Sequence, residues 1–297
     1  MATHALASHY HTTASGTKLH YAQTGNRSGS LLLCLHGLGG SIETFFPLLP
    51  HLPSTYNIVL VDFPGFGKSP LPEQPDNISI AGHVANLDDL IASLQGASTK
   101  AEPNDTVIIG HSLGAIVALQ YAAVHTEAIS GLALLGPGRA AGHIPAARQR
   151  MQDLAEAVRT KGIAFAADGA TKSNFYEDTP ERSVDPAARQ AVRRAVIASN
   201  PEAYARTCEA IVADDHKDPP YEIITVPAVF IAGDRDMISP PQRSYELSAL
   251  LGGMSWIEVV KSGHQPILED LSSVVRAVEK LLGSVAVCSA AKAMRTP

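Results

Sequence analysis

A serine bounded by glycines stands where the chain turns from an apolar strand into a helix. Gly110-His111-Ser112-Leu113-Gly114 follows the apolar run 106–109 and precedes the helix-like stretch 115–123. A turn tight enough to expose the Ser112 hydroxyl brings strand and helix so close that side chains at 110 and 114 would clash, so small residues are required there. The pentapeptide alone fits any glycine-bounded turn. The strand before it and the helix after it favour a nucleophilic serine.

A serine hydroxyl needs a histidine to accept its proton and a carboxylate to orient that histidine. Both follow downstream: Asp234 and Asp236 come after one apolar run, and His264 comes after the next. Asp234 directly follows a glycine, where a carboxylate typically caps backbone N–H groups, whereas Asp236 lies just past the strand end, ahead of Ser-Pro-Pro. We therefore assign Asp236 as the acid. The order Ser112, Asp236, His264 is that of an α/β-hydrolase triad.

Serine chemistry also requires two backbone N–H donors aimed at the oxyanion that forms on the substrate. One is expected from Leu113, the residue after the nucleophile. The other is expected from the glycine-rich loop His36-Gly37-Leu38-Gly39-Gly40, which follows the apolar run 31–35. Leu38 is the predicted donor there, because the flanking glycines leave the backbone open to the substrate.

These elements together resemble the α/β-hydrolase superfamily over roughly residues 8–283. The chain also carries Asp62-Phe63-Pro64-Gly65-Phe66-Gly67-Lys68-Ser69, similar to the structural signature after the family's fourth strand. The resemblance implies an α/β fold with a mostly parallel eight-stranded sheet, flanking helices, and a helical cap inserted after the sixth strand.

A narrower resemblance is to 3-oxoadipate enol-lactonases. Residues 199–208 resemble a cap-helix stretch of those enzymes, and Gly233-x-x-Asp236-x-x-Ser239-Pro240 resembles their acid loop. Where they commonly carry Arg-Trp-Phe, this chain reads Ser173-Asn174-Phe175, which removes a cation that could meet a carboxylated substrate. The resemblance implies a carboxylic ester hydrolase acting on a lactone or small ester through an acyl-enzyme. The alternatives are a carbon–carbon bond hydrolase of a diketone and a non-catalytic small-molecule receptor on the same fold.

The hydrophobic patterning predicts where the elements lie. Strands are expected at 10–13, 18–23, 31–35, 57–62, 106–110, 129–135, 228–233 and 255–260, with a helix over 79–94. The alternation of strand and helix stops after residue 136, and helices are expected at 146–159, 163–167, 186–198 and 201–213. We predict a core of residues 1–136 and 221–283, a helical cap over 137–220, and a C-terminal tail over 284–297. An independent second domain is the alternative for the cap segment.

Several residues are candidates for the substrate pocket or for structural roles. His111 is expected to fix the turn or line the pocket floor. Arg139 is a candidate anchor for an anionic substrate, and the alternative is that it is a solvent-exposed arginine at the mouth of the loop. Phe175 and Tyr204 are the candidate pocket residues of the cap. His36 is expected to shape its loop by hydrogen bonding.

Composition narrows the classes of partner. With 45% hydrophobic and 18% charged residues the chain is a folded globular protein, and its net charge of -6 without a basic stripe argues against nucleic acid. No segment matches a metal site, a phosphate cradle, a secretory signal or a membrane span, so we expect no cofactor, no metal and a cytoplasmic protein. Cys34 is expected to be a buried hydrophobe. The predicted partner is a small ester or lactone, and nothing in the sequence indicates the oligomeric state.

Overall fold

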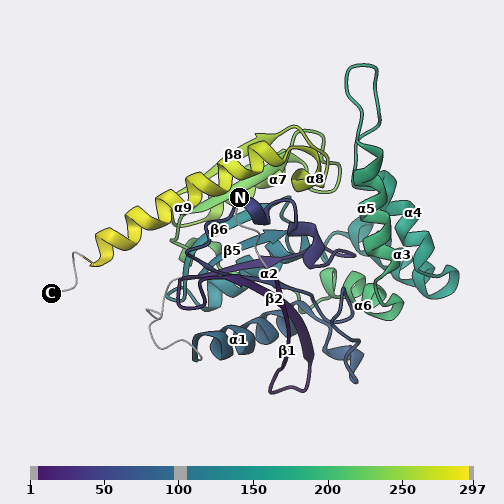
Figure 1. Cartoon of the computed structure of the whole chain (residues 1–297). Helices are drawn as coiled ribbons and strands as arrows, with labels where there is room; N and C mark the ends of the chain where they lie inside the picture. The colour runs from purple at the N-terminus through teal and green to yellow at the C-terminus, as the bar shows by residue number, and fades with distance from the viewer. Residues whose placement is uncertain (1–5, 97–105, 294–297) are drawn as a thin grey trace.

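The protein is built around one eight-stranded sheet. The computed structural model describes residues 6–96 and 106–293, and Figure 1 shows how its elements are arranged. The strand order is β1-β2-β4-β3-β5-β6-β7-β8, in which β2 is antiparallel to β1 and β4 and all other neighbours are parallel. The strands are β1 (Ala7–Thr12), β2 (Lys18–Gly25), β3 (Leu31–Leu35), β4 (Asn57–Val61), β5 (Thr106–His111), β6 (Ile129–Leu135), β7 (Ala228–Gly233) and β8 (Ser255–Val260). The predicted fold class is confirmed.

Helices cover both faces of the sheet, which explains why side chains on both faces of its central strands are buried. Strands β3, β4, β5 and β7 are buried along their whole length. Helices α1 (Ile80–Gly96), α2 (Leu113–Val124) and α7 (Pro241–Leu250) contribute to the core on one face, and α9 (Leu271–Ala293) contributes to the core on the other. In Figure 1, α9 lies above the sheet and α1 below it.

Short helices occupy the connections that lead to and from the carboxyl edge of the sheet. They are the 3-10 helices η1 (Ile42–Phe45), η2 (Leu49–His51), η3 (Pro75–Asn77) and η4 (Tyr221–Ile223), and the single-turn α8 (Pro266–Glu269). Parallel strands end at one edge of a sheet, which is where ligands bind in open α/β folds. Every residue predicted for the triad follows such a strand end.

Four α-helices lie between β6 and β7, and Figure 1 shows them gathered beside the sheet. They are α3 (Pro145–Lys161), α4 (Ile163–Ser173), α5 (Pro186–Ile197) and α6 (Pro201–Ile211). Helices α5 and α6 both begin at a proline, which suits the first helical turn. Asp185 and Asn200 cap them by accepting backbone N–H groups. We refer to residues 137–220, the segment predicted to form a cap, as the cap.

Helix α9 continues well past Gly283. Most of the segment predicted as a C-terminal tail is therefore the end of this helix, which runs to Ala293. Val285 is buried against the sheet, where its side chain approaches Gly131 of β6. The apolar stripe of α9 is buried as far as Val285, whereas Val287 beyond it is exposed. Residues 294–297 of the predicted tail and residues 1–5 of the predicted core lie outside the described part of the chain.

Candidate active site

The turn between β5 and α2 holds Ser112 in a strained backbone conformation. Ser112 has φ 52° and ψ -108°, and it is the only non-glycine residue with positive φ in the described part of the chain. Its N–H donates to the carbonyl of Leu135 at 2.9 Å, which ties the turn to β6. A Cβ on Gly110 would lie 2.6 Å from the carbonyl oxygen of Gly114, and one on Gly114 would lie 2.0 Å from that of Leu35. The close approach expected from the two glycines is thus present.

His264 and Asp236 form a buried pair. Nδ1 of His264 lies 2.7 Å from Oδ2 of Asp236, and both side chains are almost fully buried. The other carboxylate oxygen of Asp236 accepts the N–H groups of Ile238 and Ser239, each at 2.8 Å. Burial alone would raise the pKa of Asp236, but His264 and these two N–H groups outweigh it and hold the pKa below its ordinary value. The carboxylate is therefore ionised and leaves Nε2 of His264 able to accept a proton.

Asp234 has different partners from Asp236. Its Oδ1 accepts the N–H of Ser262 at 3.0 Å, and its Oδ2 accepts from Arg182 of the cap at 2.6 Å. The first contact is the backbone-capping role expected for an aspartate after Gly233. Asp234 thus braces the loop that leads to His264, and within the described chain the imidazole pairs with Asp236 instead.

The loop predicted to supply an oxyanion donor lies against the serine. A Cβ on Gly37 would lie 3.1 Å from Cβ of Ser112, and a turn closes from the N–H of Gly40 to the carbonyl of Gly37 at 3.0 Å. Leu38 lies at the centre of this turn. Leu113 is the first residue of α2, where amides have no intrahelical acceptor and the helix dipole favours negative charge. Leu113 therefore adjoins Ser112 in the chain, and the loop that carries Leu38 lies against Ser112 at Gly37.

His111 joins the serine turn to the histidine loop. Its Nε2 donates to the carbonyl of His264 at 2.7 Å, and the two rings lie 5.1 Å apart between centroids. Burial, followed by the neighbouring His264, lowers the pKa of His111 to about 3, so the ring is neutral. A neutral ring that donates through Nε2 fixes the backbone of His264.

Gly136 is a site residue that sequence reasoning missed. It follows β6 with φ 51°, and a Cβ there would lie 3.0 Å from the His264 ring and 3.2 Å from Oδ2 of Asp236. A Cβ at these distances would crowd the pair, and the positive φ disfavours any residue other than glycine. The sequence did offer one indication: Gly136 directly follows β6, the central strand to which no catalytic residue had been assigned.

Residues assigned to structural roles have buried partners. Asp62 accepts from His20, from the N–H of Ile42 and from the N–H of Lys68 at 2.7 to 3.0 Å, which fixes the signature loop after β4. His36 donates to the carbonyl of Gly37 through Nδ1 and accepts the N–H of Phe63 through Nε2, as its expected loop-shaping role requires. Cys34 is a fully buried free thiol in β3.

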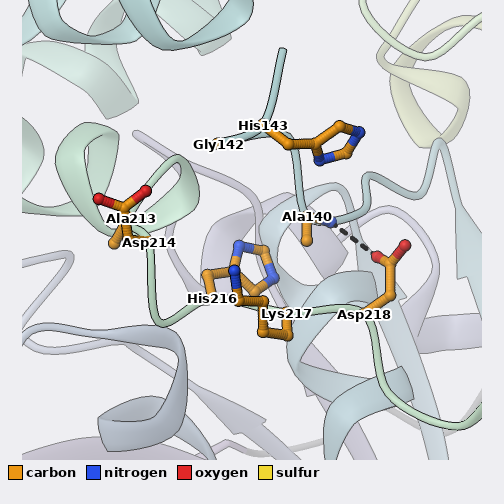
Figure 2. Close-up of a pocket in the computed structure, with 8 residues that line it drawn as sticks. All are labelled: Ala140, Gly142, His143, Ala213, Asp214, His216, Lys217 and Asp218. Atoms are coloured by element: carbon orange, nitrogen blue, oxygen red, sulfur yellow. Dashed lines mark hydrogen bonds between the residues drawn. The ribbon is translucent and has the colours of Figure 1, made fainter.

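Arg139 is paired away from the serine. Its guanidinium donates to Oδ2 of Asp218, whose Oδ1 accepts the N–H of Ala140 at 3.0 Å. Asp218 and Ala140 line a cavity of about 330 Å³ where the two ends of the cap join the core, shown in Figure 2. This pairing neutralises the cation that was considered as a substrate anchor.

Phe175 and Tyr204 are both buried, and both reach the loops around Ser112. Tyr204 approaches Gly39, where a Cβ would lie 3.0 Å from its ring. Phe175 belongs to a small apolar cluster with Tyr176, Val184 and Ala188, and its Cα lies near Gly263, beside His264. The two cap aromatics thus lie against the loop of Leu38 and the loop of His264.

The described residues contain neither a metal-binding cluster nor a membrane-spanning helix. No group of three or more His, Cys, Asp or Glu side chains is arranged to hold a metal ion. No helix in the same residues has the length and apolar character needed to cross a bilayer.

The chain belongs to the α/β-hydrolase family, because the family model, described as the alpha/beta hydrolase fold, matches residues 30–271. Lipase 1 of Psychrobacter immobilis is 28% identical over 276 residues, covering 88% of this chain and 79% of that protein. A thermophilic esterase from Thermogutta terrifontis has a TM-score of 0.80 at 22% identity, covering 94% of this chain and 99% of that one. The enol-lactonase from Burkholderia xenovorans LB400 has a TM-score of 0.78 at 24% identity, covering 93% and 100%. The two structures share the fold, and the predicted superfamily is confirmed.

Proposed function

We propose that the protein is a serine hydrolase that cleaves a carboxylic ester or lactone. The observation that carries the proposal is the buried 2.7 Å contact between His264 and Asp236 at the sheet edge where Ser112 is held at positive φ. Backbone strain of this kind persists where surrounding structure enforces it, and it clusters at active sites. Proteins similar to this chain include a lipase, an esterase and an enol-lactonase, which supports chemistry at an acyl–oxygen bond.

The proposed reaction proceeds through an acyl-enzyme. Oγ of Ser112 attacks the acyl carbon while Nε2 of His264 takes its proton, and Asp236 stabilises the imidazolium. The amides of Leu38 and Leu113 hold the oxyanion. Collapse breaks the acyl–oxygen bond, and His264 gives its proton to the departing alkoxide. Water, deprotonated by His264, then attacks the acyl-enzyme; as the bond between the acyl carbon and Oγ of Ser112 breaks, His264 gives this proton to Oγ and the carboxylic acid is released.

The charges around the site favour an uncharged substrate. Ser173 stands where a cation would meet a substrate carboxylate in the enol-lactonase pattern. Arg139 is paired with Asp218, and Arg182 with Asp234. A neutral lactone or ester would not require any of these ion pairs to break. We therefore propose neutral lactones and esters as the substrate class, with Phe175 and Tyr204 selecting among them.

Hydrolysis of p-nitrophenyl acetate tests the catalytic assignment. The wild-type protein should turn over this ester and lose activity on labelling with a fluorophosphonate, whereas Ser112→Ala should fall by on the order of 10⁴ or more and should not be labelled. A tenth of wild-type turnover in Ser112→Ala would refute the role of Ser112. A protein with neither turnover nor labelling would instead be a non-catalytic receptor.

The two aspartates offer a matched pair for the acid. Asp236→Asn should lower kcat by on the order of 10⁴ because the asparagine would hold the wrong tautomer of His264. Asp234→Asn should cost stability, since it weakens the contact with Arg182, but should leave kcat largely intact. If Asp234→Asn at equal stability proves the more damaging change in kcat, the acid has been misassigned.

Competition between substrates tests the substrate class. A neutral lactone should have a higher kcat/KM than a carboxylated enol-lactone of similar size. Phe175→Ala or Tyr204→Ala should change the ratio of these two kcat/KM values by an amount equivalent to about 1–3 kcal/mol. A wild-type preference for the carboxylated lactone would refute the proposed class. Preferential cleavage of a diketone would point to carbon–carbon bond hydrolysis.

A further inference from the structure

The loop that carries His264 is held by hydrogen bonds to three consecutive amides. Oε2 of Glu269 accepts the N–H of Gly263 at 2.9 Å and the N–H of Gln265 at 3.3 Å. Between them, the N–H of His264 donates to the carbonyl of Asn174 at 2.7 Å. One carboxylate oxygen therefore fixes the peptide groups on both sides of the histidine, and a cap carbonyl fixes the histidine itself.

Backbone packing leaves this loop little room to move. A Cβ on Gly263 would lie 2.7 Å from the carbonyl oxygen of Asn174, and a Cβ on Gly233 would lie 2.0 Å from that of Gly263. The loop is thus enclosed between the end of β7 and the first residues after α4. The amide of Gln265 also donates from its side chain to Oδ1 of Asn174 at 2.7 Å.

The side chain of Glu269 makes no other hydrogen bond in the described part of the chain. It ends the single-turn helix α8, and its second oxygen, Oε1, is buried without a hydrogen-bond partner. Burial raises the pKa of Glu269 to about 7, although the N–H groups of Gly263 and Gln265, Arg182 and Arg189 act to lower it. A buried carboxyl with an unpartnered oxygen costs stability, and its two contacts to the His264 loop act against that cost.

We propose that Glu269 is a positioning residue for His264: by accepting the amides of Gly263 and Gln265 it sets the angle at which the imidazole meets Asp236 and Ser112. The inference rests on the proposed function. Small errors in the placement of a catalytic group are costly, since about 1 Å can lower a rate 10²-fold. Asn174 completes the arrangement from the cap, so docking of the cap also bears on the histidine.

Three variants separate positioning from simple stability. Glu269→Leu removes the acceptor and should lower kcat for p-nitrophenyl acetate by about 10- to 100-fold, with KM changed less than about 2-fold. Glu269→Gln keeps a carbonyl oxygen that can accept both amides, and it should restore kcat to within about 3-fold of wild type. Asp270→Leu is the matched control, because Asp270 accepts the N–H of Lys261 from the same loop but neither amide beside His264; it should lower stability and leave kcat unchanged.

The rate of Ser112 labelling by a fluorophosphonate distinguishes the two proposals. If the wild-type protein is not labelled, the proposed function itself fails. If the wild type is labelled and folded Glu269→Leu is labelled at the same rate, the positioning role is refuted while the proposed function stands. Should Glu269→Leu not fold, Glu269→Asp provides the test, because its shorter side chain cannot reach both amides; wild-type kcat in that variant would overturn the inference.

Discussion

The strained conformation of Ser112 makes a prediction about stability that is independent of activity. At φ 52° and ψ -108° any residue with a Cβ is disfavoured, whereas glycine is not. Ser112→Ala keeps the Cβ and therefore keeps the strain, and Ser112→Gly releases it. Both variants lose the hydroxyl, so a comparison of the two isolates the backbone term.

The magnitude follows from two opposing contributions. A residue held in a sparsely populated region costs about 1–3 kcal/mol. Glycine in place of alanine adds unfolded-state entropy worth about 0.4–1 kcal/mol in the opposite direction. Ser112→Gly should therefore be more stable than Ser112→Ala by roughly 0.5–2 kcal/mol, or about 1–4 °C in melting temperature for a chain of this size.

Urea unfolding of the two variants, followed by circular dichroism, measures the difference. Ser284→Ala and Ser284→Gly are the matched control, because Ser284 lies within α9 at ordinary helical φ. There glycine should be less stable than alanine by roughly 0.8–1.0 kcal/mol. If Ser112→Gly is also less stable than Ser112→Ala, the turn is not strained in the way that its backbone angles imply.

Three further predictions concern packing and buried charge. Gly114→Ala should destabilise the protein by on the order of 3 kcal/mol in urea unfolding, because the new Cβ would lie 2.0 Å from the backbone oxygen of Leu35 in central β3. Gly169→Ala is the control: its Cβ would meet nothing within 4 Å, so this change should be neutral or stabilising. Equal effects of the two substitutions would refute the argument. His83→Leu should raise the unfolding free energy, because both ring nitrogens of His83 lack hydrogen-bond partners in the described chain. The gain should grow as pH falls from 6.5 toward 3. Burial, with His36 adding to it, lowers the pKa of His83 to about 3, so only the unfolded state takes up a proton in that range. A variant with the same acid dependence as wild type would contradict this. For Glu269 the effect of pH on stability has the opposite sign: its pKa is raised from 4.5 to about 7, so the stability that the shift contributes is present below pH 4.5 and is lost as pH rises through 7. Glu269→Gln should therefore gain stability relative to wild type across that range, as measured by denaturation at several pH values. A difference in stability that stays constant with pH would count against the raised pKa.

The amino-acid sequence by itself determined the order of elements and the candidate chemistry. The strands around Ser112, Asp236 and His264 lie where hydrophobic runs predicted them, because hydrophobic patterning and turn residues are properties of short stretches. The choice of Asp236 over Asp234 also came from local context. In the structure, Asp236 is the one that lies 2.7 Å from the His264 ring.

Only the tertiary structure decided contacts between distant segments. Arg139 was a candidate substrate anchor until the fold brought Asp218, 79 residues away, against it. Gly136 and Glu269 carried no motif, and their relation to His264 depends on how β6, α8 and the cap pack around one loop. Such contacts are set by side-chain direction and by the docking of whole elements, which local periodicity does not encode. The sequence therefore identified the groups proposed to react, whereas the fold determined which other groups hold them in place.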